Sequence, residues 1–110
     1  MKSISTHILD ISRGKPAQGV PVQLEYLKNG TFTPAATGVT DADGRVRDWK
    51  FEMITGTYRI RFEIAGYFES LKEKSFYPYV EIVFEVDNAN QHYHVPLLLS
   101  AYGFSTYRGS

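Results

Sequence analysis

Apolar residues recur at every second position in several stretches of this chain, and this period of two most limits the fold. The stretches 20–26, 57–64 and 79–86 all show it. In the second, Tyr58 and Ile60 share one face with further apolar residues, while polar and charged residues share the other. Successive side chains of a β-strand point to opposite faces, so each stretch predicts a strand with one buried face. Such strands favour antiparallel sheets, because parallel strands are usually apolar on both faces.

Turn signals separate these stretches. Asn29-Gly30 lies between two apolar runs and predicts a tight hairpin. The stretch 67–75 is the one that could form a short helix. Many short strands with regular turns are typical of a β-sandwich, so we expect an all-β, two-sheet antiparallel sandwich. Alternation and turns together predict about eight strands, at 3–10, 20–28, 31–39, 45–51, 57–65, 79–87, 92–100 and 103–109.

The composition fits one folded domain over residues 1–110. Hydrophobic residues make up 43% of the chain, which is enough for one core and argues against disorder. The formal net charge is zero, so neither a nucleic acid nor a membrane is indicated as a partner. There is no cysteine, which excludes disulfides and thiolate chemistry. No apolar run resembles a membrane span or a signal peptide, so we expect a cytoplasmic protein.

The three histidines lie on the outer faces of the predicted strands. Because Tyr93 and Val95 take the apolar face of their strand, His92 and His94 take the opposite face. His7 lies likewise on the outer face of the first predicted strand. These outer faces also carry apolar residues, which suggests that another subunit covers them.

The residues alone leave several interpretations of these histidines open. Two histidines one residue apart, joined by a distant third, can form a three-histidine zinc site. They can equally be exposed or interface residues. Acid–base catalysis is the third interpretation, since the ordinary pKa of histidine, about 6.5, suits it.

Two further residues have more than one interpretation. Pro96 argues either for an edge strand or for a bulge near the pairing partner, because proline lacks the N–H of a regular ladder. Arg45 follows Asp43-Gly44 at the exit of a predicted turn. It is either a solvated cation or a planar donor for a carbonyl or an anionic heterocycle, and Arg47 competes for the same role.

Seven short motifs are spread along the chain: STHILD at 5–10, GKPAQGVPV at 14–22, DGR at 43–45, GTY at 56–58, YF at 67–68, HYHVPLL at 92–98 and STYRGS at 105–110. Together they resemble the 5-hydroxyisourate hydrolase family, the transthyretin-like enzymes of urate breakdown. The resemblance runs from about residue 4 to the last residue. The terminal Tyr-Arg-Gly-Ser is its most specific part when it occurs together with HYHVPLL.

The resemblance implies a fold, an assembly and a reaction. The fold is a transthyretin-type sandwich of about eight strands and one short helix. The assembly is a homotetramer, a dimer of dimers, with active sites in the channel between the dimers. The reaction is hydrolysis of 5-hydroxyisourate to 2-oxo-4-hydroxy-4-carboxy-5-ureidoimidazoline, and it needs no cofactor.

The resemblance also implies which residues form the site. The catalytic positions of the family match His7, Arg45 and His94. The tetrapeptide expected to bind substrate matches the last four residues, Tyr107, Arg108, Gly109 and Ser110.

These residues suggest a metal-free scheme for the hydrolysis. One of the two histidines accepts a proton from the attacking water, and the sequence does not say which one. Arg45 holds the substrate, and its charge hinders protonation of the histidines. Arg108 and Ser110 orient the substrate ring with hydrogen bonds.

The alternative is a transthyretin-like carrier that holds a small hydrophobic ligand in the same channel without catalysis. Transthyretin itself lacks this pattern of histidines and terminal tetrapeptide. Because His7, Arg45 and His94 all occur here together with the tetrapeptide, the resemblance favours an enzyme.

Overall fold

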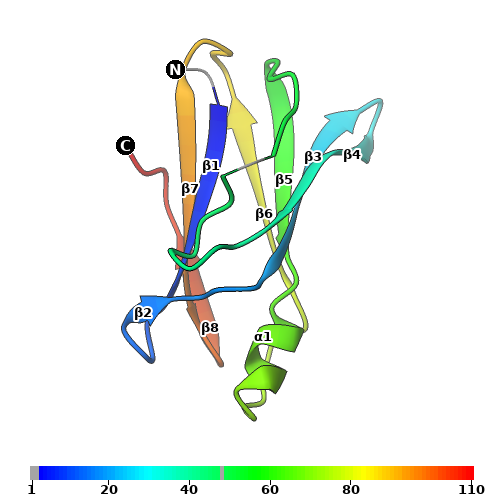
Figure 1. Cartoon of the computed structure of the whole chain (residues 1–110). Coiled ribbons are helices and arrows are strands. Elements are labelled where there is room, and N and C mark those ends of the chain that lie inside the picture. The colour runs from blue at the N-terminus through cyan, green and yellow to red at the C-terminus, as the bar shows by residue number, and fades with distance from the viewer. Residues whose placement is uncertain (1–2, 48) are drawn as a thin grey trace.

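The computed structural model describes residues 3–47 and 49–110, which form two four-stranded sheets packed face to face with one short helix at one end (Figure 1). The elements in chain order are β1 (Ser3–Asp10), β2 (Lys15–Pro16), β3 (Pro21–Lys28), β4 (Thr31–Val39), β5 (Gly56–Phe62), α1 (Ala65–Ser70), β6 (Val80–Val86), β7 (His92–Ser100) and β8 (Gly103–Thr106). The predicted all-β sandwich with a short helix is therefore confirmed.

One sheet has the strand order β2-β1-β7-β8 and the other has the order β4-β3-β5-β6. Strands β1 and β7 run parallel, with Ser3 opposite His92 and Asp10 opposite Leu99. The other pairs formed by the described residues are antiparallel. The expectation of a wholly antiparallel sandwich is wrong for this one pair. Alternation reports which face of a strand is buried, and it carries no information about the direction of a distant partner.

The alternation correctly predicted the inner faces of the strands. Tyr58, Ile60 and Phe62 of β5 are at most 1% exposed, and they pack against the buried face of the opposite sheet. Ile8 of β1 and Leu97 of β7 are completely buried there. Burying one such side chain stabilises the fold by about 1.5–3 kcal/mol, so this interior is the main source of stability.

The predicted hairpin at Asn29-Gly30 is also confirmed. It joins β3 and β4, and the backbone φ angles are 52° at Asn29 and 80° at Gly30. Two positive φ angles are what a tight two-residue hairpin of type I′ requires. The turn thus sets the register of the strand ends next to it, and an irregularity between Leu24 and Glu25 shifts the register farther along the pair.

Several predicted boundaries were wrong. The stretch 45–51 was expected to be a strand, but its described residues form only one isolated bridge, between Arg45 and His7, and Asp48 lies outside the described residues. This segment instead crosses the open edge of β1, where Trp49 Nε1 donates to the carbonyl oxygen of Ile4 at 2.9 Å. This edge is open because β2 pairs with only the last two residues of β1.

The helix and the last strand also differ in extent from the prediction. The helix covers Ala65–Ser70 instead of 67–75, and β8 ends at Thr106 instead of 109. Lys72 has a positive φ of 56°, which ends helical geometry before 75. In the described part of the chain, no helix is long and apolar enough to cross a membrane.

Pro96 does not lie in an edge strand, because β7 has β1 on one side and β8 on the other. Regular pairing with β8 starts one residue later, where Leu97 lies opposite Thr106. The Pro96 carbonyl oxygen accepts a hydrogen bond from the Thr106 hydroxyl at 2.7 Å. The missing N–H is accommodated because backbone pairing with β8 is interrupted at this position.

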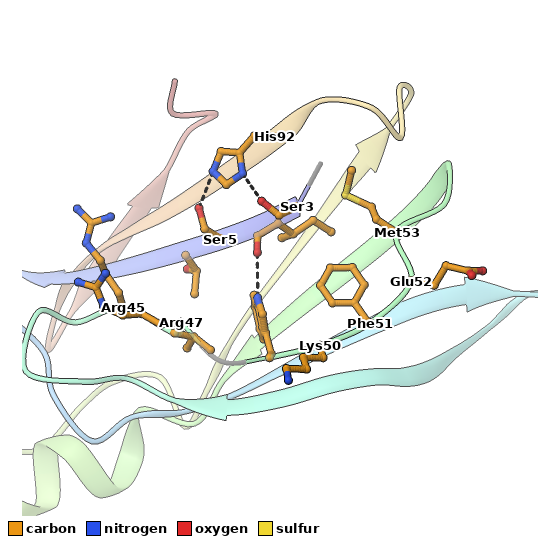
Figure 2. A pocket seen from close by; sticks show the side chains of 13 residues that line it. Ser3, Ser5, Arg45, Arg47, Lys50, Phe51, Glu52, Met53 and His92 are labelled. Atoms are coloured by element: carbon orange, nitrogen blue, oxygen red, sulfur yellow. Dashed lines mark hydrogen bonds between the residues drawn. The ribbon is translucent and has the colours of Figure 1, made fainter. Parts of the chain in front are cut away.

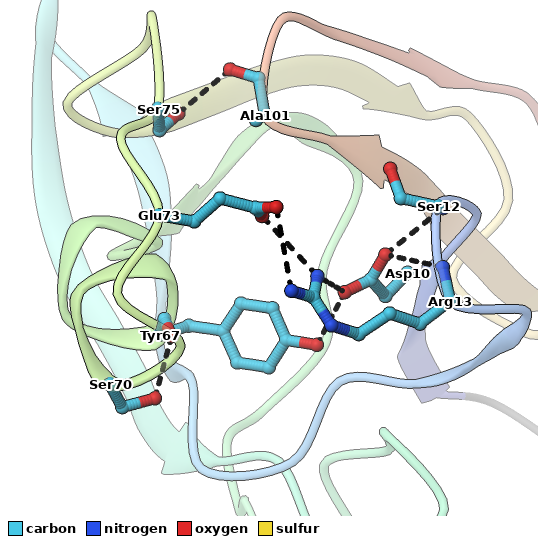
Figure 3. A network of polar contacts seen from close by, with 8 residues as sticks. All are labelled: Asp10, Ser12, Arg13, Tyr67, Ser70, Glu73, Ser75 and Ala101. Atoms are coloured by element: carbon cyan, nitrogen blue, oxygen red, sulfur yellow. Dashed lines mark hydrogen bonds and ion pairs between the residues drawn. The ribbon is translucent and has the colours of Figure 1, made fainter.

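A buried carboxylate fixes the end of β1 (Figure 3). Asp10, whose side chain is 0% exposed, accepts hydrogen bonds from the Tyr67 hydroxyl at 2.6 Å and from the Arg13 guanidinium at 3.0 Å. The backbone N–H groups of Ser12 and Arg13 also donate to it. Burial by itself raises the pKa of Asp10, but the hydrogen bonds from Tyr67 and Arg13 outweigh it and hold the pKa below the usual range. The network ties α1 to β1 three residues beyond His7.

Candidate active site

The parallel pairing of β1 with β7 brings the predicted catalytic histidines onto one sheet face. Ser5 lies opposite His94 and His7 lies opposite Pro96, so His7 is the next outward-facing residue of β1 beyond the partner of His94. Both histidines are half-buried. Residues that are 87 positions apart in the chain therefore become neighbours through a pairing that the sequence did not predict.

Arg45 reaches His7 because of a glycine. The carbonyl oxygen of Gly44 accepts a hydrogen bond from the Ile8 N–H at 2.8 Å, and Arg45 forms a backbone bridge with His7. Gly44 has a φ of +74°, and a Cβ atom placed there would lie 2.5 Å from the Ile8 carbonyl oxygen. Only glycine permits this close approach to β1, so the Asp-Gly-Arg motif positions the arginine beside the histidine.

The C-terminal tail reaches His94 in a similar way. Beyond β8 the chain returns to β7 (Figure 1), where the Gly109 N–H donates to the His94 carbonyl oxygen at 2.8 Å. A Cβ atom at Gly109 would lie 2.6 Å from His94 Cδ2. The backbone of the tail is thus packed against the His94 ring, with exposed Tyr107 and Ser110 on either side of this contact.

Arg108 is not brought to the histidines in this chain. Its guanidinium lies over the Tyr93 ring, 4.3 Å from the ring centroid, and it donates to Gln91 Oε1 at 3.2 Å. Tyr93 belongs to the buried face of β7, whereas His94 belongs to the outer face. A substrate-binding role for Arg108 therefore remains a prediction.

The surroundings of His94 favour its neutral form. Burial lowers the pKa of His94 below its ordinary value, and the positive charge of Arg45 lowers it further. His92 and His7 act in the same direction. A histidine that is neutral at physiological pH can accept a proton, which is the property a general base needs.

Two serines of β1 complete this face, and the sequence analysis did not identify them as functional. Ser5 Oγ lies 2.7 Å from His94 Nδ1 and 3.0 Å from His92 Nε2. Ser3 Oγ lies 2.5 Å from His92 Nδ1. Alternation does place Ser3 and Ser5 on the same face as His7, but their contacts depend on the parallel register with β7.

A pocket of about 750 Å³ opens between β1 and the segment 45–53 (Figure 2). Ser3, Ser5 and His92 line one side of it, and Arg45 lies at one end. The residues described do not include any group of three histidine, aspartate or glutamate side chains that could hold a metal ion. The zinc interpretation of the three histidines therefore gains no support from their geometry.

Comparison with known proteins identifies one family. Residues 4–109 match the model of the HIUase/Transthyretin family. The chain is 50% identical to the 5-hydroxyisourate hydrolase of Salmonella typhimurium, over 97% of this chain and 80% of that protein.

The fold is shared with solved structures, among them the following two. One is the 5-hydroxyisourate hydrolase of Klebsiella pneumoniae, with a TM-score of 0.82 and 37% identity over 97% of this chain and 98% of that one. The other is sea bream transthyretin in complex with thyroxine, with a TM-score of 0.90 and 31% identity over 96% of this chain and 93% of that one. From the family match over nearly its whole length and from these relatives, the chain belongs to the HIUase/Transthyretin family.

Proposed function

We propose that this protein hydrolyses 5-hydroxyisourate to 2-oxo-4-hydroxy-4-carboxy-5-ureidoimidazoline, a step in urate breakdown. Curated relatives that are 41–50% identical over nearly the whole chain are named 5-hydroxyisourate hydrolase. The observation that carries the proposal is the grouping of His94 with Arg45 and His7, in surroundings that lower the pKa of His94.

The reaction breaks a ring amide by addition of water. Water attacks the ring carbonyl while a histidine accepts one of its protons, and the carbonyl oxygen becomes an oxyanion. The C–N bond then breaks, the ring nitrogen takes a proton from the histidine pair, and the carbonyl carbon becomes a carboxyl group. His7 and His94 are proposed to handle these protons.

Arg45 is proposed to stabilise the negative charge that develops during this reaction. It is exposed and lies next to His7, so its guanidinium is free to bind a carbonyl oxygen or an oxyanion with parallel N–H groups. The same charge lowers the pKa of His94, which favours the unprotonated form of His94 before the substrate binds. One cation thus serves both the substrate and the base.

The terminal tetrapeptide is proposed to form one wall of the substrate site. Gly109 packs directly against His94, which supports a location of Ser110 near the reacting atoms. We further propose a homotetramer, a dimer of dimers, with the histidine-bearing sheet faces lining the channel between dimers. Leu9 and Leu98, which are half-buried on these faces, support coverage by another subunit.

A carrier without catalysis is not favoured. Sea bream transthyretin shares the fold at 31% identity, so the fold by itself does not separate a carrier from an enzyme. The relatives at about 50% identity are named as hydrolases.

The test is a direct assay. Purified protein is added to freshly formed 5-hydroxyisourate, and the ultraviolet absorbance of the substrate is followed against buffer alone. We expect accelerated decay that persists after treatment with EDTA. Decay no faster than in buffer would refute the proposed activity, and loss after EDTA with recovery on adding zinc would refute the metal-free scheme.

A further inference from the structure

A continuous chain of hydrogen bonds runs along the outer face of β1 and β7. It starts at Ser3 Oγ, which lies 2.5 Å from His92 Nδ1, and continues from His92 Nε2 to Ser5 Oγ at 3.0 Å. It ends at His94 Nδ1, 2.7 Å from Ser5 Oγ. Figure 2 shows the first part, with His92 held between the two serines.

This arrangement couples the protonation states of the two imidazoles. The Ser5 hydroxyl has a single proton, so it donates to one of its two histidines and accepts from the other. If Nδ1 of His94 carries the proton, it donates to Ser5, and Ser5 in turn donates to Nε2 of His92. His92 then carries its proton on Nδ1 and donates to Ser3. The reverse direction, in which Ser3 donates to His92, His92 to Ser5 and Ser5 to His94, satisfies the same contacts, so the hydrogen bonds couple the tautomers without choosing one. Only the first direction leaves Nε2 of His94 without a proton and therefore able to act as a base.

We propose that Ser5 is a positioning residue that selects the Nδ1–H tautomer of His94 and so leaves His94 Nε2 as the free basic nitrogen. His92 and Ser3 continue the chain, so their proton positions are coupled to that of Ser5. The choice of this tautomer rests on the proposed function, because His94 can act as a base through Nε2 only in this form, whereas the coupling of His94 to His92 through Ser5 does not.

A hydroxyl suits this role because it orients the ring without a charge. A carboxylate at the same place would stabilise the imidazolium and raise the pKa of the histidine. The charges that act on His94 come from Arg45, His92 and His7, and none of them is acidic. Ser5 therefore fixes the ring and its tautomer while His94 stays neutral.

The C-terminal tail packs against the His94 ring and helps to hold the orientation that this contact requires. On the side of the tail, Gly109 leaves no room between its backbone and the ring. On the side of the neighbouring histidine, the His92 and His94 rings are nearly parallel, with centroids 6.4 Å apart and an interplanar angle of 14°. The ring is thus held by the tail on one side and by the hydrogen bond from its Nδ1 to Ser5, while the parallel His92 ring lies farther away.

The experiment is NMR of protein labelled with ¹⁵N in histidine, with the tautomer read from the two-bond couplings of the imidazole. We expect the Nδ1–H form of His94 in the wild type and a clear shift toward the Nε2–H form in Ser5→Ala. Ser5→Thr, which keeps a hydroxyl, should restore the Nδ1–H form. Ser12→Ala is the matched control, because Ser12 is exposed and it is the backbone N–H of Ser12 that donates to Asp10.

Activity supplies a second readout. Ser5→Ala should lower kcat by about tenfold or more with a smaller change in KM, because the general base then presents the wrong tautomer. An Nε2–H form of His94 in the wild type, or an unchanged tautomer in Ser5→Ala, would overturn the proposal. The wild-type spectrum decides even if Ser5→Ala fails to fold. A tautomer shift in a protein that does not hydrolyse 5-hydroxyisourate would refute the proposed function and leave the positioning role intact.

Discussion

The two sheets of the sandwich present outer faces of opposite chemistry. On the β4-β3-β5-β6 sheet, Arg59 pairs with Glu25 at 2.8 Å, and Arg61 pairs with Glu63 at 2.6 Å and with Glu81 at 3.2 Å. We call these five residues the charge ladder. On the β2-β1-β7-β8 sheet, the corresponding outer positions of β1 and β7 hold serines and histidines that bond to one another.

Both sheets alternate buried and outer residues, but their outer faces differ in whether a titratable group has an ion-pair partner. In the charge ladder each guanidinium has a carboxylate, and the hydrogen bond from Arg59 to Glu25 raises the pKa of Arg59, so its proton is not available. On the other face the pKa of His94 is lowered by burial and by Arg45. Paired charges keep a sheet face soluble, whereas a titratable group beside a cation and without an acid can transfer protons.

The largest expected effect separates the two faces by activity. His7→Ala and His94→Ala should each reduce the rate of 5-hydroxyisourate hydrolysis by about 100-fold or more, the usual scale for acid–base groups. Arg59→Gln on the charge ladder should leave the rate unchanged. The rates are measured by ultraviolet absorbance, with circular dichroism to confirm folding. Equal losses in all three variants would remove the distinction between the faces.

A change at Arg45 should alter the pH dependence. Arg45→Gln removes a positive charge that lowers the pKa of His94, so this pKa should rise. The acid limb of the pH–rate profile should then move to higher pH, because His94 becomes protonated at a pH where it was neutral before. The loss of rate at neutral pH should be about tenfold or more.

Arg45→Lys is the control, since it keeps the charge and should keep the acid limb in place. An acid limb that stays fixed in Arg45→Gln would mean that this charge does not act on the catalytic histidine.

A smaller effect is expected from replacing a glycine beside His94, with a glycine of α1 as the matched control. Gly109→Ala places a Cβ atom 2.6 Å from His94 Cδ2, so the tail or the ring must move, and we expect about a tenfold loss of rate. Gly66→Ala in α1 meets nothing within 4 Å and should raise the free energy of unfolding by about 0.5–1 kcal/mol with no change in rate. Rate assays and urea unfolding measure both. Full activity in Gly109→Ala would show that the tail does not help to shape the site.

The smallest effect concerns the charge ladder. A double-mutant cycle of Glu25→Gln and Arg59→Gln should give a coupling free energy of about 0.2–1 kcal/mol in urea unfolding, because these side chains remain partly exposed. High salt should weaken the coupling further. A coupling well above this range, or a change in hydrolysis rate, would mean that the ladder is more than a solvated face.

Much of the fold could be predicted because it depends on local patterns. Alternation identified the buried faces, as at Ile60 and Leu97, and Asn29-Gly30 identified a hairpin whose geometry needs no distant partner. The pattern failed at 45–51, where the chain crosses the edge of β1 as an irregular segment held by side chains such as Trp49. Such an edge crossing depends on contacts between residues far apart in the sequence, so it has no local pattern.

The site residues stay predictions, and their arrangement could be predicted only in part. The motifs named His7, Arg45 and His94, yet the parallel register that brings them together is a long-range property without a local signature. Ser5 lies in the STHILD motif, but its contact with His94 depends on the same long-range register, so the sequence did not predict its role. Arg108 shows the reverse case, because its motif implies the site while its side chain lies over Tyr93 on the other side of β7.

The most direct measurement is an experimental structure of the protein with a purine-like analogue of 5-hydroxyisourate bound. If catalysis belongs to the outer face of β1 and β7, the analogue will lie within hydrogen-bond reach of His94 and Arg45, with the C-terminal tail beside it. An analogue bound on the charge ladder, or within the sandwich and away from His94, would contradict this assignment.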